Sequence, residues 1–214
     1  MSTSNSSRRR WHLVGFLALL FAVTLVPARA FSVISPSFGE LVNEAGRIVR
    51  ARVVAVQPYR AVTPDGTAVI KTRVTWQVER TLKGAGQTTL TLDFLGGQIG
   101  TQWLRVSGMP RFKVGNDDYL FVESDESTIC PLIAASEGRF SVRTDAASGR
   151  EYIARENGTP VVNVAEVGAP VAESTAQSAA GARTSAQAYS PADFETQIQA
   201  VLNGVKEAAT HATR

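Results

Sequence analysis

The stretch IKTRVTWQVE, residues 70–79, alternates regularly between two kinds of side chain. Ile70, Val74 and Trp76 fall on one face of an extended chain, and charged or polar residues occupy the other. This period of two is typical of a β-strand that buries one face and exposes the other. Residues 47–56 and 89–94 alternate in the same way, and turn-forming residues separate the three stretches. The sequence therefore predicts three successive strands.

Shorter elements are expected around these strands. A helix is predicted near residues 35–46, because Ser35 can cap it, Pro36 suits its first turn and Gly46 ends it. The run Tyr119–Val122 is apolar on both faces and is expected at the centre of the sheet. Three more strands are predicted, with Asn157-Gly158 as a hairpin turn between the last two: 140–142, 152–155 and 161–164.

The C-terminal part changes in composition. Residues 165–189 are rich in Ala, Ser and Thr without large apolar periodicity, which predicts a flexible linker. Residues 190–208 are expected to form an amphipathic helix whose apolar stripe includes Phe194, Ile198 and Val205. The stripe could dock on the body of the protein or be presented to a partner.

Short strands at this spacing indicate a mainly β fold. The predicted architecture is a small closed antiparallel barrel of the oligonucleotide/oligosaccharide-binding (OB) type over residues 31–164. An N-terminal capping helix, an extra β-hairpin and the tethered C-terminal helix complete it.

Residues 1–30 have the features of a signal peptide. A basic run at 8–10 precedes an apolar stretch at 13–26, and Ala28-Arg29-Ala30 forms a small-x-small cleavage site. Cleavage would make Phe31 the first residue of an exported protein, and a retained anchor is the alternative. The apolar stretch is shorter than the roughly 20 residues of a membrane-spanning helix, so no stable span is expected after cleavage.

Charge, histidine and cysteine content exclude several function classes. Four of the 22 basic residues lie in the first thirty, which contain no acid, so the rest of the chain is nearly neutral and nucleic acid is not an expected partner. The two histidines, His12 and His211, lie outside the predicted body, which excludes His-based triads and the common zinc sites there. Cys130 is the single cysteine. It could be a buried small hydrophobe, an accessible thiol or an intermolecular link.

The order of elements resembles the netrin-like or tissue-inhibitor-of-metalloproteinase-like module over about residues 35–142. The matching segments are a first strand, VTWQV followed by LKG, and Gly-x-x-x-Tyr-Leu-Phe-Val, at 48–56, 74–84 and 115–122. The chain is also similar to uncharacterised secreted bacterial proteins with the same pattern. The resemblance implies a closed OB-type barrel and a protein partner such as an exported protease.

The sequence departs from that family at its N-terminus. The inhibitors chelate a protease zinc through an N-terminal cysteine held by a disulfide, whereas this chain would begin with Phe31-Ser32. With no histidine in the predicted body and a single cysteine in the chain, no catalytic residue, metal ligand or cofactor site is predicted. The candidate binding surface consists of Phe31, Ser32, Gly97 and Trp103. Aromatic faces can stack on sugars or peptides, and Trp103 has no strand pattern around it.

The remaining motifs have structural interpretations. Asp117-Asp118 and the run at 124–127 could bind calcium or act as general acid and base, but acids in a turn are expected to be solvated. Gly96-Gly97 is expected to bend the chain after a strand, since no helix or lysine follows to hold a phosphate. Trp76 is expected in the core. A basic stripe of Arg50, Arg52, Lys71 and Arg73 is expected to be a solvated face.

The sequence thus predicts an exported, non-enzymatic binding module with an unidentified protein partner. A structural or assembly protein of the cell envelope is the alternative. A hydrolase that uses carboxylates alone is the third hypothesis, and it requires opposed acids around a cleft.

Overall fold

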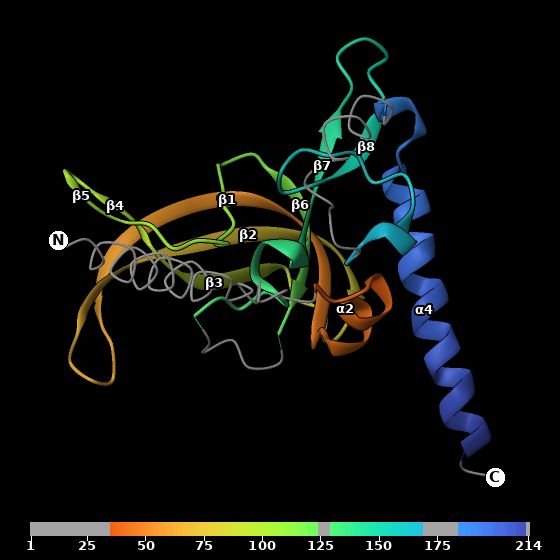
Figure 1. The fold of residues 1–214 in the computed structure, drawn as a ribbon, viewed down its shortest axis with the longest axis horizontal. Helices are drawn as coiled ribbons and strands as arrows, with labels where there is room; N and C mark the ends of the chain where they lie inside the picture. Colours follow the sequence, from red (N-terminus) through yellow and green to blue (C-terminus); the bar gives the residue numbers. More distant parts are fainter. Residues whose placement is uncertain (1–34, 124–128, 169–183, 213–214) are drawn as a thin grey trace, which may run out of the picture. The chain divides into compact units, whose positions relative to one another are not determined.

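A computed structural model describes residues 35–123, 129–168 and 184–212, all within one compact unit, Ile34–Arg214 (Figure 1). The predicted signal peptide, Phe31, Ser32, the acidic run at 124–127 and most of the predicted linker lie outside these residues. The strands and the two longer helices are, in chain order, α2 (Phe38–Glu44), β1 (Arg47–Val62), β2 (Ala68–Lys83), β3 (Thr89–Leu95), β4 (Gly97–Ile99), β5 (Gln102–Leu104), β6 (Asp117–Val122), β7 (Arg139–Thr144), β8 (Glu151–Arg155) and α4 (Pro191–Ala212).

Helix α2 begins slightly later in the sequence than predicted. Its N-cap is Ser37, not Ser35, because Ser37 and Glu40 form a reciprocal capping box. The Glu40 carboxylate accepts a hydrogen bond from the Ser37 N–H at 2.7 Å. Phe38, Leu41 and Val42 are buried on the inward face of the helix.

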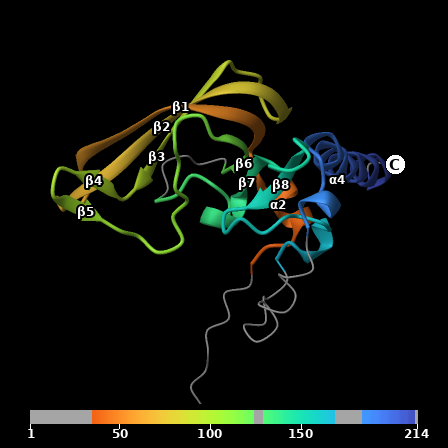
Figure 2. The ribbon, with the colours of Figure 1, turned by 90° about the horizontal axis from the view of Figure 1, so that it is seen from above.

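The predicted mainly β fold is confirmed as a six-stranded antiparallel sheet with the order β3-β2-β1-β6-β7-β8. β1 and β2 form a long curved hairpin with register shifts along β1 (Figure 1). β3 pairs with β2 on the side away from β1. The described strand pairings leave β3 and β8 at opposite edges, so the sheet is not closed. β4 and β5 form a separate two-stranded sheet at the end remote from α4 (Figure 2).

β6 lies centrally, as predicted, and all six of its residues are buried. Its alternating side chains therefore contribute to two separate cores. Tyr119 and Phe121 pack with α2, α4, β7 and β8, whereas Leu120 and Val122 pack with β1, β2 and β3. The second core also contains Trp76, which is fully buried as expected.

The C-terminal hairpin differs from the prediction. The hairpin pairs β7 with β8, and the chain after Asn157-Gly158 returns along β8 with one isolated bridge, Ala154 to Pro160. Val161 still donates to the Ile153 carbonyl oxygen, but the Ile153 N–H donates to the Tyr189 carbonyl oxygen, so the pairing with β8 goes no further. The predicted strand at 161–164 is therefore wrong, and a short 3₁₀ helix, Val164–Glu166, begins there.

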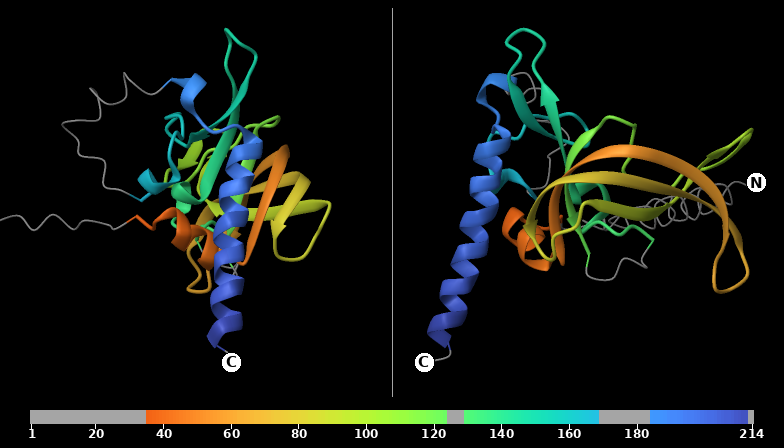
Figure 3. Two further views of the ribbon diagram at one scale, coloured as in Figure 1. Left: turned by 90° about the vertical axis from the view of Figure 1, so that its right-hand side faces the viewer. Right: turned by 180° about the vertical axis from the view of Figure 1, so that it is seen from behind.

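Helix α4 docks on the body of the protein, and its outer turns extend beyond it (Figure 3). Phe194 and Ile198 are fully buried against the first core, while Val205 is 48% exposed. The ends of the predicted linker that are described also pack inward, since Val167 and Ala188 are each 2% exposed. Within the described ranges, neither helix has the length and apolar character to cross a membrane.

Candidate binding groove

Two of the predicted surface residues come together on the β4–β5 pair. Gly97 pairs with Leu104, and the next register position pairs Gln98 with Trp103. Trp103 therefore lies in a short strand and not in the irregular stretch expected from the sequence. Phe31 and Ser32 lie outside the described residues, so the structure assigns them no place. Within the described residues, the candidate surface therefore centres on Gly97 and Trp103.

The two glycines turn the chain from β3 into β4, which agrees with the bend expected from the sequence. Gly96 and Gly97 have φ of +108° and +141°, a region that glycine occupies without strain. The Thr72 hydroxyl donates to the Gly96 carbonyl oxygen at 2.6 Å, and the Gly96 N–H donates to the Ile70 carbonyl oxygen at 2.8 Å. A Cβ at Gly97 would collide with the Thr72 hydroxyl oxygen. β4 can therefore lie directly against β2 only because residue 97 has no side chain.

A groove of about 550 Å³ opens beside this bend. Residues of β1, β2 and β3 form one side, and β4, β5 and the segment 105–113 form the other. Its side chains are mainly apolar. The apolar and aromatic lining residues are Val56, Pro58, Val74, Phe94, Leu95, Trp103, Leu104, Val106, Met109, Pro110 and Phe112.

Trp103 is the most exposed aromatic side chain of the groove. It is 64% exposed, and the Arg105 guanidinium lies 5.3 Å from its ring centroid. Cations at this distance from a ring face are attracted to it. The stacked pair presents an apolar surface and a positive charge together at the mouth of the groove.

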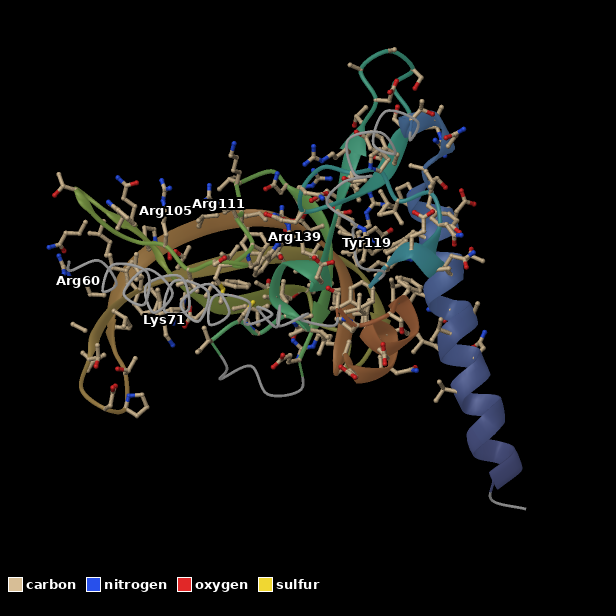
Figure 4. The ribbon with its side chains drawn as sticks, viewed as in Figure 1. Arg60, Lys71, Arg105, Arg111, Tyr119 and Arg139 are labelled. Atoms are coloured by element: carbon tan, nitrogen blue, oxygen red, sulfur yellow. The ribbon has the colours of Figure 1, made fainter. Side chains whose placement is uncertain are left out.

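The rim of the groove is basic. Arg105, Arg111 and Lys113 line it, and none of the described lining residues is acidic. A signal for this rim exists in the sequence, because no acid occurs between Asp93 and Asp117, but the prediction of a binding surface at Gly97 and Trp103 did not include it. Figure 4 shows Arg105 and Arg111 close together, with Lys71 apart from them.

Aromatic side chains pack against one another in one wall of the groove. Phe112 meets Trp76 edge to face, with ring centroids 5.0 Å apart, and its centroid lies 4.9 Å from that of Phe94. Edge-to-face aromatic pairs are favourable beyond the area they bury. Phe112 is thus a wall of the groove and a contact of the second core.

Behind this wall, Arg139 forms a buried ion-pair network. Its guanidinium donates to both oxygens of Asp118 at 3.0 and 3.1 Å, to Glu156 at 2.5 Å and to the Arg111 carbonyl oxygen at 2.6 Å. Arg139 is 5% exposed and Asp118 is fully buried. Burial raises the pKa of the Asp118 carboxyl, and the charge of Arg139 opposes that shift.

The expectation that Asp117 and Asp118 are solvated is therefore wrong. Both are buried, because each faces an arginine from a neighbouring strand. Arg50 donates to Asp117 at 2.7 Å from β1, and Arg139 binds Asp118 from β7. Successive residues of a strand point to opposite faces, so the two carboxylates do not oppose each other across a cleft.

The predicted basic stripe is mostly paired with acids. Arg50 is only 19% exposed, Arg52 binds Glu79 at 3.1 Å and Arg73 binds Asp93 at 2.9 Å. The Arg73 guanidinium lowers the pKa of Asp93. These bases are therefore neutralised within the sheet, unlike those of the groove.

A second, polar hollow of about 510 Å³ adjoins the groove, because Arg111 and Lys113 line both. It is lined by cations, hydrogen-bonding groups and two carboxylates. Its lining residues are Arg111, Lys113, Asn116, Asp117, Arg139, Ser141, Val142, Arg143, Thr144, Tyr152 and Glu156.

Among the described residues, no three His, Cys, Asp or Glu side chains gather where they could hold a metal ion. No family model matches the chain, and neither a curated protein nor a solved structure matches it. The groove itself is consequently the basis for assigning a function.

Proposed function

We propose that this chain is an exported, non-enzymatic protein-binding module and that the groove beside Trp103 is its binding site. One observation carries the proposal. A tryptophan that is 64% exposed stands over an apolar groove with a basic rim. Large aromatic side chains in such positions commonly supply much of the free energy of binding at protein interfaces.

The groove is large enough to receive side chains of a protein partner. A hollow of about 550 Å³ is within the range of about 300–1,000 Å³ that is typical of small-ligand pockets, so it has room for side chains of a partner. A partner would therefore insert one or two side chains while its backbone crosses the rim. An exported protease is the partner class that the netrin-like resemblance implies. That resemblance and the closed barrel remain predictions, since the described strand pairings form an open sheet.

Site-specific photo-crosslinking in the native cell tests this proposal. A photoreactive phenylalanine analogue replaces Gln98, which is exposed in the groove lining beside Trp103, in one variant. It replaces Thr196, which is exposed on α4, in a matched control. We expect a defined crosslinked partner from position 98 and none from position 196. A partner captured from position 196 alone would favour the alternative, an envelope assembly protein that binds through α4.

Export is tested on the same sample. N-terminal sequencing of the purified protein should identify Phe31 as the first residue, as the predicted signal peptide requires. A chain that retains residues 1–30 would contradict cleavage.

The carboxylate-only hydrolase has weaker support, because Asp117 and Asp118 each form ion pairs on opposite faces of β6. If any hydrolytic activity were found, replacing both by alanine would test it. A folded double variant with full activity would exclude this pair as the catalytic acids.

A further inference from the structure

We infer that the partner segment bound by the groove is an extended acidic peptide. In this arrangement a large apolar side chain of the partner fills the groove beside Trp103, and carboxylates next to it pair with Arg105, Arg111, Lys113 and Arg143. The inference rests on the proposed function and specifies the chemistry of the partner.

Charge complementarity is the first argument. In the described part of the chain, Arg105, Arg111, Lys113 and Arg143 have no carboxylate within ion-pair distance, whereas Arg50, Arg52 and Arg73 each do. The two carboxylates of the polar hollow, Asp117 and Glu156, are already paired with Arg50 and Arg139. The four cations without internal partners around the two adjoining hollows therefore produce a positive potential there. Without these four cations, residues 31–214 contain 14 basic and 19 acidic side chains, so the positive potential is confined to this surface and favours an acidic partner there.

The order of the two hollows is the second argument. The apolar groove and the polar hollow share Arg111 and Lys113, so a ligand can pass from one into the other across these two side chains. An apolar group at one end and an anionic group farther along would match this order of surfaces. The ligand must therefore be amphipathic along its length.

The polar hollow distinguishes a peptide from an acyl chain. The hydroxyl groups of Thr144 and Tyr152 can each donate and accept hydrogen bonds there. The Asn116 amide nitrogen can donate, and the Ser141 hydroxyl, which donates to Asp118, can still accept. A peptide backbone offers an N–H and a carbonyl at each residue and can satisfy both kinds. A fatty acid or a lipid offers hydrogen-bonding groups only at its head group, so the lining fits a peptide better.

A display selection with random decapeptides on the full-length mature protein provides the probe. We expect selected sequences in which an aromatic or large aliphatic residue is followed within about three residues by Asp or Glu, consistent with the about 3.3 Å rise per residue of an extended chain. Synthetic peptides from this selection should bind more weakly as salt increases, because the rim charges are exposed.

Variants then locate the binding site. Trp103→Ala should weaken binding of a selected peptide by about thirtyfold or more, as expected for an aromatic anchor. Arg111→Glu should weaken it by roughly tenfold and should bind better to a peptide in which lysine replaces the acids. Lys71→Glu is the matched control and should leave the affinity unchanged. Lys71 neighbours Thr72, which lines the groove, so alternation along β2 directs the Lys71 side chain to the other face.

Each other outcome has a distinct meaning. Peptides that require Trp103 but contain no acids and show no salt dependence would overturn the inference and leave the proposed function in place. Peptides that bind independently of Trp103, or no selected peptides, would overturn both. Binding of phosphatidylglycerol vesicles that is lost in Trp103→Ala, without peptide binding, would identify a lipid as the ligand and also overturn both.

Discussion

The guanidinium of Arg139 lies 4.5 Å from the ring centroid of Phe112 while it binds the buried carboxylate of Asp118. The same guanidinium donates to the carbonyl oxygen of Arg111, the residue before Phe112. One side chain of β7 therefore fixes both the backbone and the ring of the groove wall. The buried ion pair and the candidate binding groove are parts of one structure.

Loss of the Asp118 carboxylate should destabilise the protein. We expect Asp118→Ala to lower the free energy of unfolding by about 3–5 kcal/mol, because Arg139 then stays buried without its main partner. Asp93→Ala, which breaks a more exposed pair with Arg73, should cost about 1 kcal/mol or less. Urea denaturation of both variants measures the difference, and equal losses would contradict the structural role of the Asp118 pair.

Gly97 should not tolerate a side chain. Gly97→Ala places a methyl group against Thr72 at a positive φ, and we expect a loss of roughly 1–3 kcal/mol in stability. Gly86→Ala is the control, because a Cβ there meets no atom within 4 Å and its φ is not positive. That variant should change stability by less than about 0.5 kcal/mol. Similar unfolding midpoints for the two variants would show that β4 is not packed closely against β2.

Helix α4 should contribute to the stability of the body. The Phe194 ring lies 5.0 Å from that of Phe140 and 5.2 Å from that of Tyr119, measured between centroids. Phe194→Ala should therefore cost about 3–5 kcal/mol, while Gln199→Ala on the exposed face should be nearly neutral. Thermal unfolding monitored by near-ultraviolet circular dichroism would test this. A negligible effect of Phe194→Ala would instead indicate a helix free to bind a partner.

Asp145 should make the attachment of the segment before α4 dependent on pH. Hydrogen bonds from the Ser185 hydroxyl and from Ser148 lower the pKa of the Asp145 carboxyl to about 2. Because the folded pKa lies below the unfolded value of about 3.9, this stabilisation is present above that unfolded value and is lost as the pH falls through the folded pKa.

Hydrogen exchange at residues 184–190 measures this effect. Asp145→Asn should increase exchange at about pH 6, well above both pKa values, and the difference from the wild type should shrink in exchange measurements made near the folded pKa. Equal protection of the two proteins at the higher pH would contradict the proposed attachment.

Cys130 should react slowly while the protein is folded. The residue is 9% exposed, and burial raises the pKa of its thiol to about 11. Since the thiolate is the reactive form, little of it is present at about pH 8. Alkylation with iodoacetamide should therefore be slow in buffer and fast in about 8 M urea, a denaturing concentration for most domains. Rapid labelling of the folded protein would contradict burial.

Much of the architecture could be predicted from local sequence patterns. The alternation in residues 70–79 and 89–94 identified β2 and β3, and the apolar run at Tyr119–Val122 identified a central strand. These predictions succeeded because side chains alternate between faces over a few residues, whatever the rest of the chain does. The helix start at Ser37 could also have been found, since its capping box lies within four residues.

The buried acids could not be predicted in this way. Asp117 and Arg50 are 67 residues apart in the chain, and Asp118 and Arg139 are 21 residues apart. An acid in a turn is indistinguishable by sequence from one that meets an arginine across a strand. Whether a carboxylate is solvated or paired depends on the register of neighbouring strands.

The groove also depends partly on local sequence and partly on the tertiary structure. The sequence by itself determined that Gly97 follows a strand, but the prediction that Trp103 lies in an irregular stretch is wrong, because Trp103 belongs to the short strand β5. Only the tertiary structure decided that both meet Phe94, Met109 and Phe112 around one hollow. Strand propensity and turn chemistry act over neighbouring residues, whereas a groove forms where distant segments pack incompletely against each other.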